Sequence, residues 1–105
     1  RVQDESLRRI AYHNMIYIGD GLTDIPCMKL VKERGGKSIA VYPAGNREHV
    51  KPLVEDARIN YVCMADYSPD SPLERIVKLM IENMAITEKL KKEERSQLSH
   101  YKTKK

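Results

Sequence analysis

Short apolar runs alternate along this chain with stretches whose apolar residues recur every three or four positions. The runs are Asn14–Gly19, Ser38–Tyr42 and Ile59–Met64. Runs of this length without a long polar alternation are typical of strands buried on both faces. We therefore predict three strands, and the first is apolar enough to be central in its sheet.

The stretches between the runs predict helices. Thr23 or Asp24 can cap the first one, and Gly35-Gly36 ends it. A second, short helix is expected from about residue 47 to residue 58. The apolar positions that give these two helices their periodicity are Ile25, Met28 and Val31 in the first, and Val50, Leu53, Val54 and Ala57 in the second.

A third helix begins at Ser71-Pro72-Leu73-Glu74, which combines a capping box with proline at the first helical position. Its apolar positions carry it through the mid-eighties: Leu73, Ile76, Val77, Met80 and Met84. Strands that alternate with helices in this way predict an α/β fold with a layered parallel sheet. Three parallel strands make a poor complete domain, so we expect part of the sheet to be missing from this chain.

Three segments are therefore expected in the 105 residues. Residues 1–13 are polar and predict a loop or partial helix, residues 14–87 form the α/β core, and residues 88–105 form a basic helical or frayed tail. Residues 1–87 hold 12 basic and 12 acidic side chains, so the net charge of +4 comes from the tail, with seven basic and three acidic ones. Charge confined to a terminal tail does not predict nucleic-acid binding.

Other classes of protein are disfavoured by simple features of the sequence. No apolar run approaches the roughly 20 residues that span a bilayer, so no membrane association is expected. Cys27 and Cys63 lie far apart in apolar segments, where a free cysteine behaves as a small buried hydrophobe. The three histidines form no zinc-ligand spacing with each other or with a cysteine. Reduced thiols fit a cytoplasmic protein.

The segment with candidate chemistry follows the first strand and reads Gly19-Asp20-Gly21-Leu22-Thr23-Asp24. In parallel α/β sheets, ligands bind at the carboxyl ends of the strands, where this loop is expected to lie. Glycine at positions 19 and 21 allows a sharp turn and a close approach of the backbone to a ligand. Two carboxylates held close together in this loop would repel each other unless a cation lay beside them. Mg²⁺ prefers oxygen ligands of this kind.

Alternative interpretations of these glycines and acids differ in weight. A dinucleotide fingerprint would need a third glycine at Asp24, where an acid would face the pyrophosphate. Gly36-Lys37-Ser38 resembles the end of a phosphate-binding P-loop, but its first glycine would fall on Val31 and the segment leads into a strand. Both are rejected. The remaining alternative, that Asp20 is only a turn former and Asp24 only a helix cap, stays open on spacing alone.

The sequence GDGLTD after the strand NMIYI resembles the fourth motif of the haloacid dehalogenase-like (HAD) hydrolases. The likeness extends over about residues 14–85, which resemble the C-terminal part of a bacterial phosphatase-like member. The segments that carry it are IPCMKLVKERGG, SIAVY and INYVCMADYSPDSPLERIVKLMI. The resemblance implies a three-layer Rossmann-like fold and a Mg²⁺ site. It makes Asp20 the direct metal ligand, has Asp24 bind through water or orient the ligand shell, and gives Gly19 and Gly21 the shaping of the loop.

The sequence departs from this family in what precedes the loop. The family's nucleophilic and acid/base aspartates belong to a DxDx[TV] motif, which this chain lacks, so no catalytic residue is expected in it. One hypothesis is therefore the C-terminal portion of a magnesium-dependent phosphohydrolase, completed by a missing N-terminal half and acting on a phosphorylated small molecule. The other is a non-catalytic remnant that associates with a partner, or with itself, through the edge of its first strand.

Overall fold

The computed structural model describes residues 14–57 and 59–102. The chain divides into two compact units with the boundary between Glu74 and Arg75. The first unit contains a sheet with its helices, and the second consists of helix. Each is described by itself below, and the predicted segment 1–13 lies outside the described residues.

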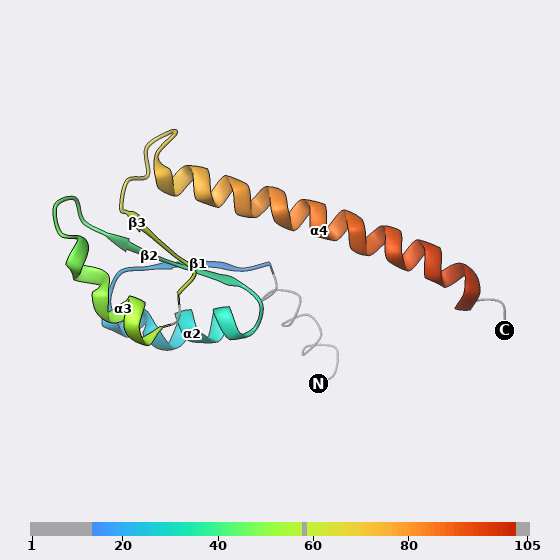
Figure 1. The fold of residues 1–105 in the computed structure, drawn as a ribbon, viewed down its shortest axis with the longest axis horizontal. Coiled ribbons are helices and arrows are strands. Elements are labelled where there is room, and N and C mark those ends of the chain that lie inside the picture. The colour runs from blue at the N-terminus through green and yellow to red at the C-terminus, as the bar shows by residue number, and fades with distance from the viewer. Residues whose placement is uncertain (1–13, 58, 103–105) are drawn as a thin grey trace. The chain divides into compact units, whose positions relative to one another are not determined.

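The three predicted strands form one parallel sheet in sequence order (Figure 1). They are β1 (Ile16–Gly19), β2 (Lys37–Tyr42) and β3 (Tyr61–Met64). In the register, Ile39 of β2 is the partner of Ile18 on one side and of Tyr61 on the other. The predicted α/β class, with parallel strands that alternate with helices, is confirmed.

Only the middle strand, β2, is thoroughly buried. Ser38, Ile39 and Ala40 have no exposed surface. By contrast, β1 lies at one edge of the described sheet, and Ile18 is 38% exposed. The expectation that the first strand is buried on both faces is therefore wrong for the part of the chain that the structure describes, because no described strand pairs with its outer edge.

The helices of the first unit begin and end where backbone chemistry dictates. A 3₁₀ turn, η1 (Leu22–Asp24), leads into α2 (Ile25–Glu33), which has proline in its first turn as predicted. Gly35 then takes φ 95°, a left-handed conformation that favours glycine and ends the helix. The helix expected over 47–58 is split into a 3₁₀ turn, η2 (Arg47–Val50), and α3 (Lys51–Asp56). Pro52 accounts for the division, since proline suits the first turn of an α-helix and not its interior.

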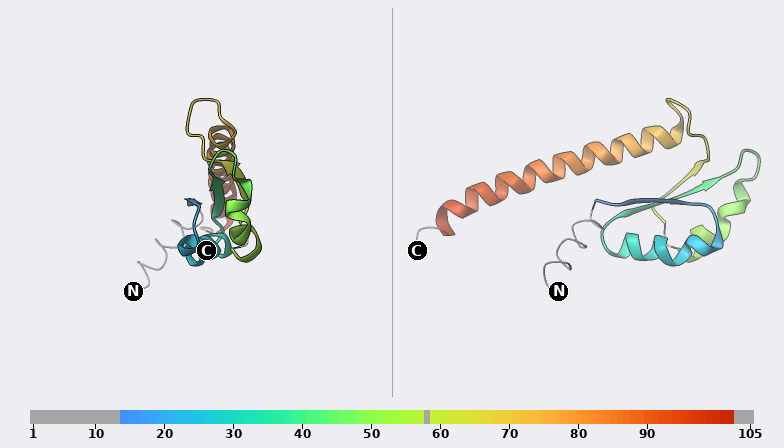
Figure 2. Two further views of the ribbon diagram at one scale, coloured as in Figure 1. Left: turned by 90° about the vertical axis from the view of Figure 1, so that its left-hand side faces the viewer. Right: turned by 180° about the vertical axis from the view of Figure 1, so that it is seen from behind.

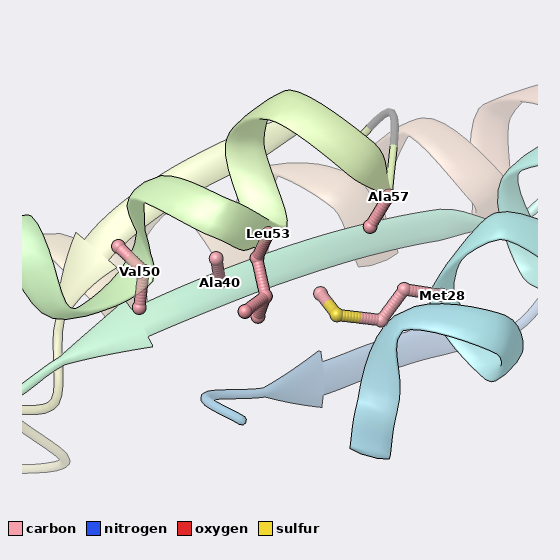
Figure 3. Close-up of a cluster of buried hydrophobic side chains, with 5 residues drawn as sticks. All are labelled: Met28, Ala40, Val50, Leu53 and Ala57. Carbon is pink, nitrogen blue, oxygen red and sulfur yellow. The ribbon is translucent and has the colours of Figure 1, made fainter. Parts of the chain in front are cut away.

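These helices and the sheet enclose one cluster of buried side chains (Figure 3). It consists of Met28, Ala40, Val50, Leu53 and Ala57. Its members come from α2, from β2, and from the segment that runs through η2 and α3, so both helical segments cover the same face of the sheet. The remaining apolar position of the second predicted helix, Val54, is 48% exposed and does not belong to the cluster.

The second unit is formed by α4 (Pro72–Lys102), which begins within the first unit and continues as one unbroken helix (Figure 1 and the right-hand view of Figure 2). Its start partly follows the predicted capping box, since the Glu74 N–H donates to Ser71 Oγ at 3.2 Å. Glu74 Oε1, however, accepts the N–H of Asp70 at 2.7 Å instead of that of Ser71. The helix runs well past the mid-eighties through most of the predicted tail. No helix within the described ranges is long and apolar enough to cross a membrane.

Candidate functional site

The predicted loop joins the carboxyl end of β1 to the start of α2. Gly19 is the last residue of β1, Asp20 and Gly21 form the link, and Asp24 is the last residue of η1. Because the strands are parallel, the links that follow β2 and β3 lie at the same end of the sheet, the carboxyl ends of the strands. The loop therefore lies where ligands bind in parallel α/β sheets.

The Asp24 carboxylate closes this loop on itself. Its Oδ2 accepts the N–H groups of Asp20 and Gly21, each at 3.1 Å. Its Oδ1 accepts the hydroxyl of Tyr17 from β1 at 2.8 Å. We call these three hydrogen bonds the Asp24 clamp. They join the end of the strand to the start of the helix, so Asp24 fixes the shape of the loop.

Of the two glycines, Gly19 is the one that the geometry requires. A Cβ added to it would lie 2.7 Å from Asp24 Cγ and 2.9 Å from Asp24 Cβ, closer than side chains pack. Gly21 has φ −126° and ψ 167°, an extended conformation open to other residues, and a Cβ there would lie 3.9 Å from Asp24 Oδ2. Glycine at position 19 thus allows the Asp24 carboxylate to reach the strand end.

The clamp shifts the titration of both side chains that form it. The N–H of Gly21, then the hydroxyl of Tyr17, stabilise the charged carboxylate and lower the pKa of Asp24. The hydrogen bond to Asp24 is the largest cause that raises the pKa of Tyr17 to about 12, followed by partial burial and by the negative charge of Asp24. At neutral pH the pair is therefore a charged carboxylate and a neutral phenol that donates to it.

Asp20 has the opposite environment. Its side chain is exposed, and its carboxylate accepts no hydrogen bond from the described residues, although its own N–H is held by Asp24. The clamp thus fixes the backbone of Asp20 and leaves its carboxylate available to a cation. Across residues 14–57 and 59–102, no three His, Cys, Asp or Glu side chains are grouped so that they could hold a metal ion. Asp20 therefore offers one exposed carboxylate, whereas Mg²⁺ typically takes one or two carboxylates and its remaining ligands from water or substrate.

Two residues at this edge were not predicted from the sequence. Tyr17 looked like one more apolar strand residue, and the signal that could have identified it is a hydroxyl seven residues before an aspartate, at the end of the same strand–turn unit. Arg47, the first residue of η2, lies with its guanidinium 5.6 Å from the centre of the Tyr42 ring. It brings a positive charge to the edge of the sheet that carries the loop.

The cysteine prediction is correct for only one of the two thiols. Cys63 is buried on β3, and burial raises its pKa. Cys27 is exposed, because it precedes Met28 on α2 by one position and so points about 100° away from the buried row. Both are free thiols, and Cys27 interacts with the hydroxyl of Tyr17 and contributes to its raised pKa.

Comparison of the chain with models of known protein families, with curated proteins and with solved structures finds no match.

Proposed function

We propose that this chain contributes the magnesium-holding loop and part of the sheet of a HAD-like phosphohydrolase of the cytoplasm. The whole protein would act on a phosphorylated small molecule, with the attacking aspartate supplied by a segment outside this chain. Asp20 would hold the metal ion, and Asp24 would hold the loop that presents Asp20. The proposal includes the three-layer Rossmann-like form of the complete sheet.

One observation carries the proposal: Asp24 is used in hydrogen bonds within the loop, whereas the side chain of Asp20 is exposed. The Asp24 clamp uses both carboxylate oxygens on the loop itself, while the Asp20 carboxylate is exposed at the carboxyl end of β1. An exposed carboxylate in a turn is common in itself; what favours a ligand role here is its place at the carboxyl end of β1, on a backbone that the clamp holds. The resemblance of GDGLTD to the fourth HAD motif agrees with this division of roles.

The chemistry assigned to this chain is binding and orientation. Bound Mg²⁺ would offset the repulsion between a phosphate ester and an incoming carboxylate. Asp20 supplies one negative oxygen ligand, and the clamp prevents the loop from rearranging when the ligand arrives. No described residue is assigned the nucleophilic step, which needs an aspartate that this chain lacks.

Magnesium binding by the chain itself tests the proposal. We expect Mg²⁺ to shift the amide NMR signals of residues 19–24 with a dissociation constant of millimolar order or weaker, because most of the shell is left to water. Asp20→Asn should remove the shifts. Asp56→Asn is the matched control. Asp56 is an exposed aspartate at the end of α3, shortly before β3 begins, and so lies toward the amino ends of the strands, away from the loop. Micromolar affinity would contradict the incomplete site, and shifts that survive Asp20→Asn would contradict the role of Asp20.

Enzyme assays address the other half of the proposal. The chain alone should not hydrolyse p-nitrophenyl phosphate in the presence of Mg²⁺, because the attacking carboxylate is absent. In a longer protein that contains the DxDx[TV] segment, Asp20→Ala should abolish turnover, and Asp24→Ala should leave more residual activity because its role is indirect. Turnover by the chain alone that disappears with Asp20→Asn would refute the assignment.

The second candidate function is association through the outer edge of β1. It is favoured by the position of β1 at the edge of the described sheet and by the 38% exposure of Ile18. An unpaired strand edge offers backbone hydrogen bonds to another strand. Ile18→Lys should then weaken self-association or binding of the missing half while leaving Mg²⁺ shifts at the loop unchanged.

A further inference from the structure

The helix α4 carries a second row of apolar side chains besides the stripe that its periodicity predicts. Leu79, Ile86 and Leu90 are 60%, 57% and 66% exposed. At about 100° per residue, these three positions and Asn83 lie within about 60° of one another around the helix. We call this row, Leu79, Asn83, Ile86 and Leu90, the α4 ridge.

The spacing of the ridge is that of a coiled-coil seam. Its members follow one another at four, three and four residues, which is the alternation of the two core positions of a heptad repeat. In that frame Leu79 and Ile86 occupy the d position, and Asn83 and Leu90 occupy the a position. Ile86 at d and Leu90 at a would alone favour three or four strands, but an asparagine at a single a position specifies register and oligomer state, as it does in two-stranded coiled coils.

We infer that α4 pairs with α4 of a second copy of this chain, as a parallel, in-register, two-stranded coiled coil along the α4 ridge. Each ridge then packs against its own counterpart, which is the self-complementary contact of a two-fold dimer. The two Asn83 side chains meet across the axis and can hydrogen-bond to each other. This inference does not depend on the proposed phosphohydrolase function.

Charges beside the ridge favour the same partner. Lys89 lies at the g position and Glu94 at the following e position, so a parallel, in-register pair brings each lysine opposite the other copy's glutamate. A membrane surface of anionic lipid would instead meet acidic side chains on both sides of the ridge, at Glu82 and Glu94. The mixture of signs fits a second α4 better than a uniformly charged surface.

The seam is short, because it becomes polar after Leu90. The next d and a positions are Glu93 and Gln97, whose side chains are joined by a hydrogen bond of 3.0 Å from Gln97 Nε2 to Glu93 Oε2. Two Glu93 carboxylates would face each other across a dimer. Fewer than three apolar heptads make a weak pair, so the dimer should be in concentration-dependent exchange with the monomer.

Sedimentation equilibrium of the full chain, from micromolar to millimolar concentration, tests the inference. Ile86→Glu should weaken the dimer by about tenfold or more, since it places a charge in the seam. Ile81→Glu is the matched control: Ile81 is 54% exposed on the same helix but about 160° from the ridge, so the dimer should be unchanged. Circular dichroism verifies that both variants keep α4.

A variant that should strengthen the dimer is also needed, because a weaker dimer could result from misfolding alone. Glu93→Leu removes the facing carboxylates and extends the apolar seam, so it should strengthen the dimer by about tenfold. A monomer at all concentrations for both the parent chain and Glu93→Leu would overturn the inference. Equal effects of Ile86→Glu and Ile81→Glu, or a dimer abolished by Ile18→Lys alone, would overturn it in favour of another surface.

The orientation is tested by oxidation of Gln97→Cys in a Cys27→Ser, Cys63→Ala background. A parallel, in-register pair brings the two introduced thiols together, and a disulfide-linked dimer should form readily. An antiparallel pair centred on the ridge would separate them by about 38 Å along the axis. Failure to cross-link under conditions where sedimentation shows a dimer would refute the parallel arrangement.

Discussion

The hydroxyl of Tyr17 offers the most direct test of the Asp24 clamp. Tyr17→Phe removes the donor of the 2.8 Å hydrogen bond to Asp24 Oδ1 and leaves the ring, which packs against the buried cluster. The two backbone N–H groups continue to hold Oδ2. The variant therefore separates the interactions of the hydroxyl, chiefly this hydrogen bond and to a smaller extent the one with Cys27, from the packing of the ring.

The expected loss at neutral pH is about 1–2 kcal/mol of unfolding free energy. Hydrogen bonds to charged groups contribute about 1.5–3 kcal/mol, and this one lies toward the low end because Asp24 is only half-buried. The clamp lowers the pKa of Asp24, so its stabilisation is present above the unfolded value of about 3.9 and is lost as the pH falls through the folded value. The raised pKa of Tyr17 sets an upper pH limit for the clamp, because the stabilisation from the neutral phenol is lost as the pH rises from about 10 toward about 12.

Urea unfolding followed through the amide NMR signals of β2 measures this loss without interference from α4. The difference between Tyr17→Phe and the parent chain should be constant between about pH 5 and pH 9 and should shrink below about pH 4. Tyr67→Phe is the control, since Tyr67 is 68% exposed in the loop after β3 and should change stability little. A difference that is the same at pH 3 and pH 7, or equal effects of the two variants, would refute the charged clamp.

Three further predictions concern the same region. Asp24→Asn should bring the pKa of Tyr17 from about 12 down toward 10, as measured by ultraviolet titration, because its charged acceptor is lost. Gly19→Ala should lower the free energy of unfolding of the first unit by about 1–3 kcal/mol in urea, because the added Cβ displaces the Asp24 carboxylate. It should also lower the pKa of Tyr17, and unchanged values for both quantities would contradict the close contact. Cys27 should react with a thiol reagent in the folded chain and Cys63 only after unfolding, and equal rates would show that the difference in burial is wrong.

The parallel sheet could be predicted because its strands are marked by composition and its connections by helical periodicity. The burial of β2 agrees with its sequence, Lys37–Tyr42, whose middle residues are all apolar or small, but the first strand is by its sequence apolar enough to be central as well. The exposure of Ile18 could not be predicted in the same way. An apolar run shows that a strand is suited to burial on both faces, but burial also depends on a neighbouring strand, which no described residue supplies for the outer edge of β1.

The length of α4 could not be fixed from its apolar stripe, and residues 88–105 were expected to be either helical or frayed. The expected helix was traced by its apolar stripe, which ends at Met84. Beyond that residue the chain is rich in lysine and glutamate, which favour helix without a buried face. Side-chain pairs one turn apart add to this preference, such as Lys91 with Glu88 at 3.9 Å. Periodicity detects burial, whereas intrinsic propensity extends this helix through Lys102.

The two aspartates show where sequence reasoning about the site reaches its limit. The same residue type, four positions apart, allows either two metal ligands or a turn former and a helix cap. What separates Asp20 from Asp24 is the position of donors that the motif does not contain: the hydroxyl of Tyr17 on the strand and the two N–H groups of the turn. These donors use Asp24 to hold the loop, and the fixed loop in turn presents Asp20 at the edge of the sheet. A cation at this edge would therefore depend on Asp24 for the shape of its site and on Asp20 for its charge, and that is why the two substitutions should differ in effect.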